Sequence, residues 1–195
     1  GLSLNTSSLV EGISNADSIT VNPQKLLGIT KTSSLLLVAD RSHLFSAFST
    51  GLPYMEPPWD EAHGGEVGLQ GTRPAEVLKL WLGLRHLGEQ GIQDLLDGAI
   101  RRRSSFQDKL DPLKFKLFSG PLHLIAFTPI GLEKKQDEQW SIDVRKSLLD
   151  QQFMLSRCIY KGSHCLKAVF GNPHTQQIHL DILEDLLTKS LTNFF

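Results

Sequence analysis

The sequence of 195 residues contains only two cysteines, Cys158 and Cys165. A disulfide framework needs more cysteines than this, so a small secreted fold held together by disulfides is excluded. The two cysteines flank the turn-forming run Lys161-Gly162-Ser163, which predicts that they lie on neighbouring strands. We expect reduced, partly buried thiols, as in a cytoplasmic protein.

An excess of charge of one sign is also missing, because 20 basic residues stand against 21 acidic ones and the formal net charge is −1. This balance gives no reason to expect a nucleic acid or a membrane surface as partner. No apolar run approaches the ~20 residues that a membrane span needs, and the first residues show no secretory signal pattern. The sequence therefore predicts a soluble globular chain that binds neither nucleic acid nor membranes.

Methionine is absent before Met55, and the chain begins at Gly1. We therefore expect a processed product, the remnant of an expression tag, or a fragment of a longer protein. The length suits one domain or two small ones.

The most informative segment is a lysine that directly follows a predicted strand. Ile19 and Val21 alternate with polar neighbours, which predicts extended chain up to Asn22. Pro23 ends the strand, because proline fixes its own φ and disfavours the helical region for the residue before it. Lys25 then stands in a tight turn. Imine formation with an aldehyde needs such a fixed amine in its neutral form, whereas a solvated surface charge is the alternative.

A second strand, a short helix and a long loop are predicted next. Residues 32–39 form an apolar strand that we expect to be covered on both faces. The short gap before it favours antiparallel or neighbouring strands. The segment 40–42 can cap a short helix that runs through Phe48. Residues 49–72 form a loop of a length that is usually functional or disordered.

Two helices are predicted after this loop. Pro74 suits the first turn of a helix that runs to Leu87, with Trp81 in its apolar, core-facing stripe. Gly88 ends this helix, and a second one follows over residues 90–110. Its arginine triplet at 101–103 is expected to be a solvated face.

After Asp111-Pro112 the pattern changes to that of a smaller α+β unit. Residues 134–139 are expected to form a charged loop, with Trp140 as a packing or rim residue. Thr175 is expected to be the N-cap of the last helix. The scattered histidines form no metal site. The predicted strands are 114–119, 122–128, 157–160 and 165–170, and the predicted helices are 143–155 and 175–191.

Four ordered motifs carry a resemblance to a known family. In chain order they are Asn22-Pro23-Gln24-Lys25, residues 33–38, Gln70-Gly71-Thr72-Arg73-Pro74 with residues 78–81, and Gly171-Asn172-Pro173. The series resembles the group II pyridoxal-phosphate-dependent amino-acid decarboxylases, which include the glutamate, aromatic amino-acid and 2,4-diaminobutyrate decarboxylases. The likeness runs from near residue 1 to the last helix with compatible spacing.

The resemblance implies an α/β fold. Residues 1–88 are expected to be the C-terminal part of the cofactor-binding large domain of a fold type I pyridoxal-phosphate-dependent transferase, including the lysine turn and the active-site loop. Residues 89–195 are expected to be the small α+β C-terminal domain. The resemblance further implies pyridoxal 5'-phosphate as cofactor, an amino acid as substrate and a homodimer as the assembly.

The family's cofactor-binding residues map onto two of these motifs. Lys25 matches the lysine of the internal aldimine. Gln24 stands where the family usually has a histidine that helps to hold the cofactor phosphate, and its amide can still donate a hydrogen bond. Thr72 falls where the family places a donor to the phosphate of the partner subunit, and the amides of Gly71 and Thr72 near a helix start suit an anion. A plain capped helix start is the alternative.

The substrate-binding residues that the resemblance implies are less well matched. Lys167 stands where many relatives have an arginine that binds the substrate carboxylate, and lysine keeps the charge without the planar fork; the alternative is a solvated charge on an edge strand. Several relatives return the proton from a loop tyrosine, but no tyrosine occurs between Met55 and Arg73. His63 could donate this proton or be an ordinary loop histidine. Tyr54 is expected at the wall of the active site.

The function that the resemblance implies is decarboxylation of an L-amino acid through Lys25, as a carboxy-lyase that is part of a longer or complemented enzyme. The family takes the acidic partner of the pyridine nitrogen from sequence that precedes the position of Gly1. The alternative is a catalytically inactive decarboxylase-like fragment that serves only as a folded or dimerising module.

Overall fold

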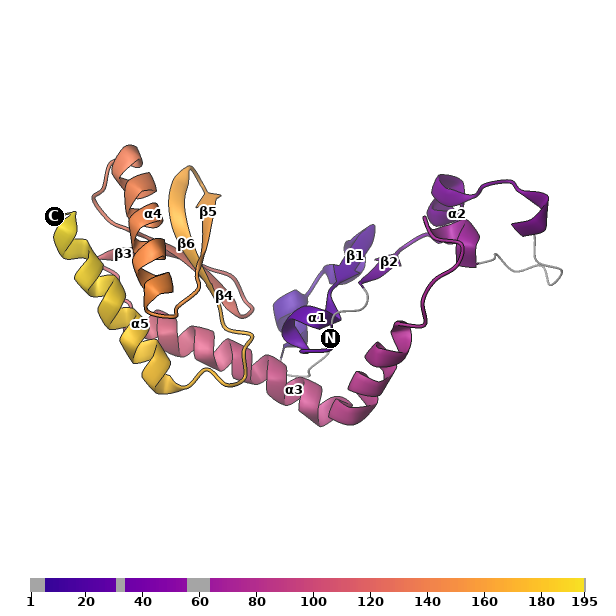
Figure 1. Ribbon diagram of the computed structural model, residues 1–195, viewed down its shortest axis with the longest axis horizontal. Coiled ribbons are helices and arrows are strands. Elements are labelled where there is room, and N and C mark those ends of the chain that lie inside the picture. The colour runs from indigo at the N-terminus through magenta and orange to yellow at the C-terminus, as the bar shows by residue number, and fades with distance from the viewer. Residues whose placement is uncertain (1–5, 31–33, 56–63, 195) are drawn as a thin grey trace. The chain divides into compact units, whose positions relative to one another are not determined.

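The computed structural model describes residues 6–30, 34–55 and 64–194 (Figure 1). The chain divides into two compact units. One covers Glu11–Gly88, and the other joins Glu89–Phe195 with the segment up to Val10. Five short 3-10 helices lie among the described residues: Ser7–Val10, Ile13–Asn15, Pro53–Met55, Gly64–Val67 and Leu191–Asn193.

The first unit contains a two-stranded antiparallel sheet of β1 (Ser18–Val21) and β2 (Leu35–Val38). The register places Ser18 opposite Val38 and Val21 opposite Leu35, so the antiparallel arrangement is confirmed. The expectation that β2 is covered on both faces is wrong for the described chain, because Leu36 and Leu37 are each 53% exposed. Among the described residues no third strand pairs with β1 or β2.

Two helices frame the long loop of this unit. The helix α2 (Ser42–Phe48) forms as predicted, and the helix α3 (Val77–Lys109) begins three residues later than Pro74. Gly88 interrupts α3 with φ 64, a left-handed conformation that glycine adopts without steric cost. The sequence-based prediction of a helix end at Gly88 is therefore correct for the backbone.

The second unit contains a four-stranded antiparallel sheet in the order β3-β4-β6-β5. Each strand pairs with the next through a continuous register, and Cys158 lies directly opposite Cys165. Both cysteines are free thiols, as expected. The strands are β3 (Phe115–Ser119), β4 (Leu124–Pro129), β5 (Ser156–Tyr160) and β6 (Ser163–Val169).

The helices α4 (Lys134–Asp150) and α5 (Gln177–Ser190) lie beside this sheet in Figure 1 and share one hydrophobic core with it. Large apolar side chains fill this core, and their burial is the main source of its stability. Its fully buried members include residues from the end of α3, from α4 and α5, and from the strands β3, β4 and β6. They are Phe106, Phe115, Ile125, Phe127, Trp140, Leu166 and Leu187.

Several expectations for this unit are wrong. Residues 134–139 are helical and not a loop, because Glu133 and Gln136 form a capping box that begins α4 there. Trp140, expected as a packing or rim residue, is a packing residue of the core with none of its surface exposed. The last helix is capped by Gln176 and not by Thr175.

The arginine triplet is not a uniformly solvated face either. Arg102 Nε donates to the Phe170 carbonyl at 3.2 Å, and Arg103 Nε donates to the Leu122 carbonyl at 2.9 Å. The Phe170 amide in turn donates to the His123 carbonyl. The two arginines therefore fix α3 to the end of the β4–β6 pair.

Candidate functional site

Lys25 stands at a backbone position that local interactions define well. It is the third residue of the one-turn helix α1 (Pro23–Leu26), and its amide donates to the Asn22 carbonyl at 3.0 Å. Pro23 is buried beneath the turn, whereas the Lys25 side chain is exposed. The Ser34 hydroxyl donates to Asn22 Oδ1, which ties the start of α1 to the approach to β2.

The Lys25 amine enters no ion pair within the described part of the chain. Gln24 beside it is half-buried. A primary amine and a side-chain amide at the end of a strand can respectively bind an aldehyde covalently and donate a hydrogen bond to an anion. This pair of groups fits a phosphorylated aldehyde such as pyridoxal phosphate.

A buried carboxylate organises the long loop between α2 and α3. Glu66 Oε2 accepts from the Ser49 hydroxyl and the Thr50 amide, both at 2.8 Å, and Oε1 accepts from the Thr50 hydroxyl at 2.6 Å. Hydrogen bonds from Thr50 and Ser49 hold the pKa of the Glu66 carboxyl below its ordinary value. Glu66 is not among the residues predicted from the sequence, although an acid within a glycine-rich loop that follows Ser49-Thr50 was a possible signal.

The last part of this loop is held by Arg73. Its Nη2 donates to the Gly64 carbonyl at 2.9 Å, and its Nε donates to the Gln70 carbonyl at 3.1 Å. The guanidinium lies so close to Gly68 that a Cβ there would approach Nη2 to 2.5 Å, so a side chain at this position would displace the end of Arg73. Gly71 and Thr72 lie within this closed segment and are exposed.

Tyr54 and His63 are the two remaining candidates in this loop. Tyr54 lies in the 3-10 helix Pro53–Met55 and is 80% exposed. His63 lies outside the described residues. The first unit thus contains Gln24, Lys25, Tyr54, Gly71 and Thr72, whereas Lys167 belongs to the second unit.

Lys167 lies on β6, between Ala126 of β4 and Ser156 of β5. The reading of this residue as a charge on an edge strand is wrong, because β6 is an inner strand of the sheet. Its half-buried side chain lines a hollow of about 560 Å³, together with Phe118 and Tyr160. The two rings meet edge to face with their centroids 5.1 Å apart. The described side chains that line this hollow include no carboxylate.

Cys158 also lines this hollow, whereas its cross-strand neighbour Cys165 is fully buried. Burial, and to a smaller extent the nearby Cys158, raise the pKa of the Cys165 thiol to about 11. Cys165 is therefore a core residue and not a nucleophile.

The described residues contain no group of three or more His, Cys, Asp or Glu side chains that could hold a metal ion. None of the helices over the same residues combines the length and apolar character that a membrane crossing requires.

The chain is similar to proteins of one family. The family model described as "Pyridoxal-dependent decarboxylase conserved domain" matches residues 2–127. Tyrosine decarboxylase 2 of Arabidopsis thaliana is 23% identical over 194 residues, which cover 95% of this chain and 36% of that protein. Acidic amino acid decarboxylase GADL1 of Mus musculus is 30% identical over 162 residues, which cover 80% of this chain and 30% of that protein. The chain thus spans about a third of the length of these curated relatives.

Solved structures share the fold. Mouse CSAD in its apo form superposes with a TM-score of 0.77 at 22% identity, over 97% of this chain and 42% of that one. Oryza sativa TDC with PLP and tryptamine superposes with a TM-score of 0.78 at 18% identity, over 95% of this chain and 40% of that one. These likenesses confirm the expected α/β fold class, that of fold type I.

Proposed function

We propose that this chain, which belongs to the pyridoxal-dependent decarboxylase family, takes part in the decarboxylation of an L-amino acid. Lys25 is the lysine that binds the cofactor. The chain acts as part of a longer or complemented cytoplasmic enzyme. The observation that carries this proposal is the position of Lys25 at a strand end, fixed by Pro23 and Asn22, with an amine that no described carboxylate neutralises.

Lys25 holds the cofactor, and the rigid turn limits the directions from which its amine approaches the aldehyde. When it is bound, pyridoxal phosphate supplies an electron sink that accepts the electrons of the bond to the leaving carboxylate. The protein's part is to orient the substrate and to hold the cofactor phosphate. The side-chain amide of Gln24 donates a hydrogen bond to the cofactor phosphate.

Gly71 and Thr72 serve the cofactor phosphate of a partner subunit in a homodimer. Both residues are exposed and lie in the segment that Arg73 closes, which limits the movement of their backbone. A twofold dimer is then the smallest active assembly. A monomer in sedimentation that still binds the cofactor tightly would contradict this assignment.

Lys167 binds the substrate carboxylate. Its hollow is lined by two lysines, Lys161 and Lys167, by two aromatic rings and by no described acid, which suits an anionic group. Tyr54 contacts the substrate, and His63 returns the proton after carbon dioxide has left.

Covalent trapping tests the role of Lys25. The chain is incubated with pyridoxal phosphate, reduced with borohydride under native conditions and mapped by peptide mass. We expect the label on Lys25, loss of the label in Lys25→Arg, and an unchanged label in Lys79→Arg, because Lys79 is already paired with Glu76 at 2.6 Å. Labelling spread evenly over surface lysines, or no label at all, would refute the proposal and favour a catalytically silent chain.

A further inference from the structure

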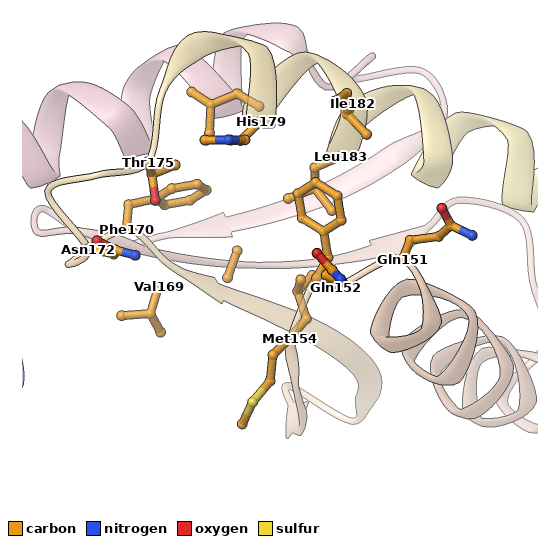
Figure 2. Close-up of a pocket in the computed structure, with 14 residues that line it drawn as sticks. Gln151, Gln152, Met154, Val169, Phe170, Asn172, Thr175, His179, Ile182 and Leu183 are labelled. Atoms are coloured by element: carbon orange, nitrogen blue, oxygen red, sulfur yellow. The ribbon is translucent and has the colours of Figure 1, made fainter.

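A second cavity, remote in sequence from the lysine turn, lies in the second unit. It has a volume of about 490 Å³, within the ~300–1,000 Å³ that binding pockets usually have. Figure 2 shows Gln152 and Met154 on one side, Val169 and Phe170 on another, and residues of α5 such as Ile182 above them. Its apolar walls and amide-bearing rim are not used by the proposed function.

The cavity opens beside Val169, the last residue of the inner strand β6. The ladder between β5 and β6 ends at Ser156, which lies opposite Lys167. Beyond this pair, residues 153–155 leave the sheet, so no strand residue faces Val169 on that side.

The hydrogen-bonding direction of Val169 follows from the register. The Phe170 amide donates to the His123 carbonyl of the neighbouring β4 side, and the direction alternates along an antiparallel strand. The amide and carbonyl of Val169 therefore point away from β4, towards the position that β5 has left. Among the described residues, no backbone hydrogen bond outside the regular strand ladders involves the amide or the carbonyl of Val169. Val169 lines the cavity.

The backbone of Gln152, at the rim of the cavity, has an unfavourable conformation. It has φ 66, in the left-handed region that disfavours residues with a side chain. The Phe153 amide donates to the Leu148 carbonyl and the Gln152 amide donates to that of Leu149, the helix-ending pattern in which glycine is usual at this place. A glutamine in this conformation is costly for the fold, and its side-chain amide lines the cavity.

We propose that this cavity binds a short extended peptide segment that adds to β6 at Val169. The side-chain amide of Gln152 forms a hydrogen bond with the edge of the peptide that faces away from β6. One peptide residue exchanges two main-chain hydrogen bonds with Val169, as in strand addition. The residues on either side of it point their side chains towards Phe153, Leu180 and Leu183 in the cavity wall. The preferred sequence pattern is therefore apolar, polar, apolar.

The blocked tripeptide acetyl-Leu-Ser-Leu-amide tests the proposal on the 195-residue chain labelled with nitrogen-15. We expect the Val169 amide proton to shift downfield and to exchange more slowly with solvent on titration. The same tripeptide methylated on its serine nitrogen lacks the donor and binds roughly tenfold more weakly. Equal binding of both peptides, or binding that leaves the Val169 resonance unmoved, would overturn the proposal.

The variant Gln152→Gly separates binding from folding. It relieves the left-handed strain, so we expect a higher unfolding midpoint together with a severalfold weaker affinity for the tripeptide. Lys161→Gly is the matched control, because Lys161 has φ 48 in the β5–β6 turn, outside the cavity. It should also raise the midpoint but leave the affinity unchanged. An unchanged affinity in Gln152→Gly would remove Gln152 from the site.

Discussion

Thr50 donates two hydrogen bonds to the carboxylate of Glu66, from its amide at 2.8 Å and from its hydroxyl at 2.6 Å. The two residues lie on opposite sides of a segment that the sequence alone describes only as a long loop. Because the carboxylate accepts on both oxygens, it fixes the exit of α2 relative to the 3-10 helix Gly64–Val67. This helix precedes Gly71 and Thr72, the proposed phosphate donors.

The variant Glu66→Gln should loosen the loop without unfolding the unit. A glutamine amide can accept on one oxygen only, so at least one of the donors of Ser49 and Thr50 loses its partner. We expect faster hydrogen exchange of the Thr50 amide, measured by mass spectrometry or NMR. The control Glu76→Gln, which removes an exposed ion pair with Lys79, should leave this exchange rate unchanged.

The loop should also respond to acid. The pKa of Glu66 is lowered in the folded chain from its ordinary value of 4.5. A depressed carboxyl pKa contributes stability that is present above the ordinary value and is lost as the pH falls through the lowered one. Protection of the Thr50 amide should therefore be constant above about pH 5 and decline below pH 4.5. An exchange profile, corrected for intrinsic rates, that stays flat to pH 3 would contradict this.

Trp140 and Trp81 should differ strongly in their contribution to stability. Trp140 is fully buried and its Nε1 donates to Ser190 Oγ at 3.2 Å, whereas Trp81 is 57% exposed. Trp140→Ala leaves a core cavity and should lower the free energy of unfolding by about 3–5 kcal/mol. Trp81→Ala should change it by less than about 1 kcal/mol. Urea unfolding of the whole chain, followed by circular dichroism, measures both.

The arginine triplet offers a comparison between adjacent residues. Arg103→Met removes the donors to the carbonyls of Leu122 and Pro121 and should cost about 1–3 kcal/mol of unfolding free energy. Arg101→Met, at an exposed position, should stay within about 0.5 kcal/mol. Thermal unfolding of the two variants side by side distinguishes these outcomes, and equal losses would contradict the role given to Arg103.

The two thiols should react at different rates. The half-buried Cys158 should react with a disulfide reagent at pH 8, whereas Cys165 should react only after unfolding, because burial raises its pKa to about 11. A raised thiol pKa contributes stability that is complete below the ordinary value of 9.0 and declines as the pH rises towards 11. Two fast-reacting thiols in the native chain would refute the assignment.

Local sequence by itself determined the parts of the protein whose causes lie within a few residues. The alternation of Ile19 and Val21 and the fixed φ of Pro23 are enough to place Lys25 in a turn after β1. The turn between the cysteines places Cys158 opposite Cys165, and Gly88 marks the break in α3. These features need no distant partner.

Only the tertiary structure decided which side chains are buried and which polar groups are paired. The sequence predicts a core-facing stripe for Trp81 and a packing or rim position for Trp140, yet Trp81 is exposed and Trp140 packs against Phe115 and Phe127. Arg102 bonds a carbonyl 68 residues away and Glu66 bonds a residue 16 away. The physical reason is that burial and hydrogen bonding depend on groups that folding brings together, and local propensity carries no information about them.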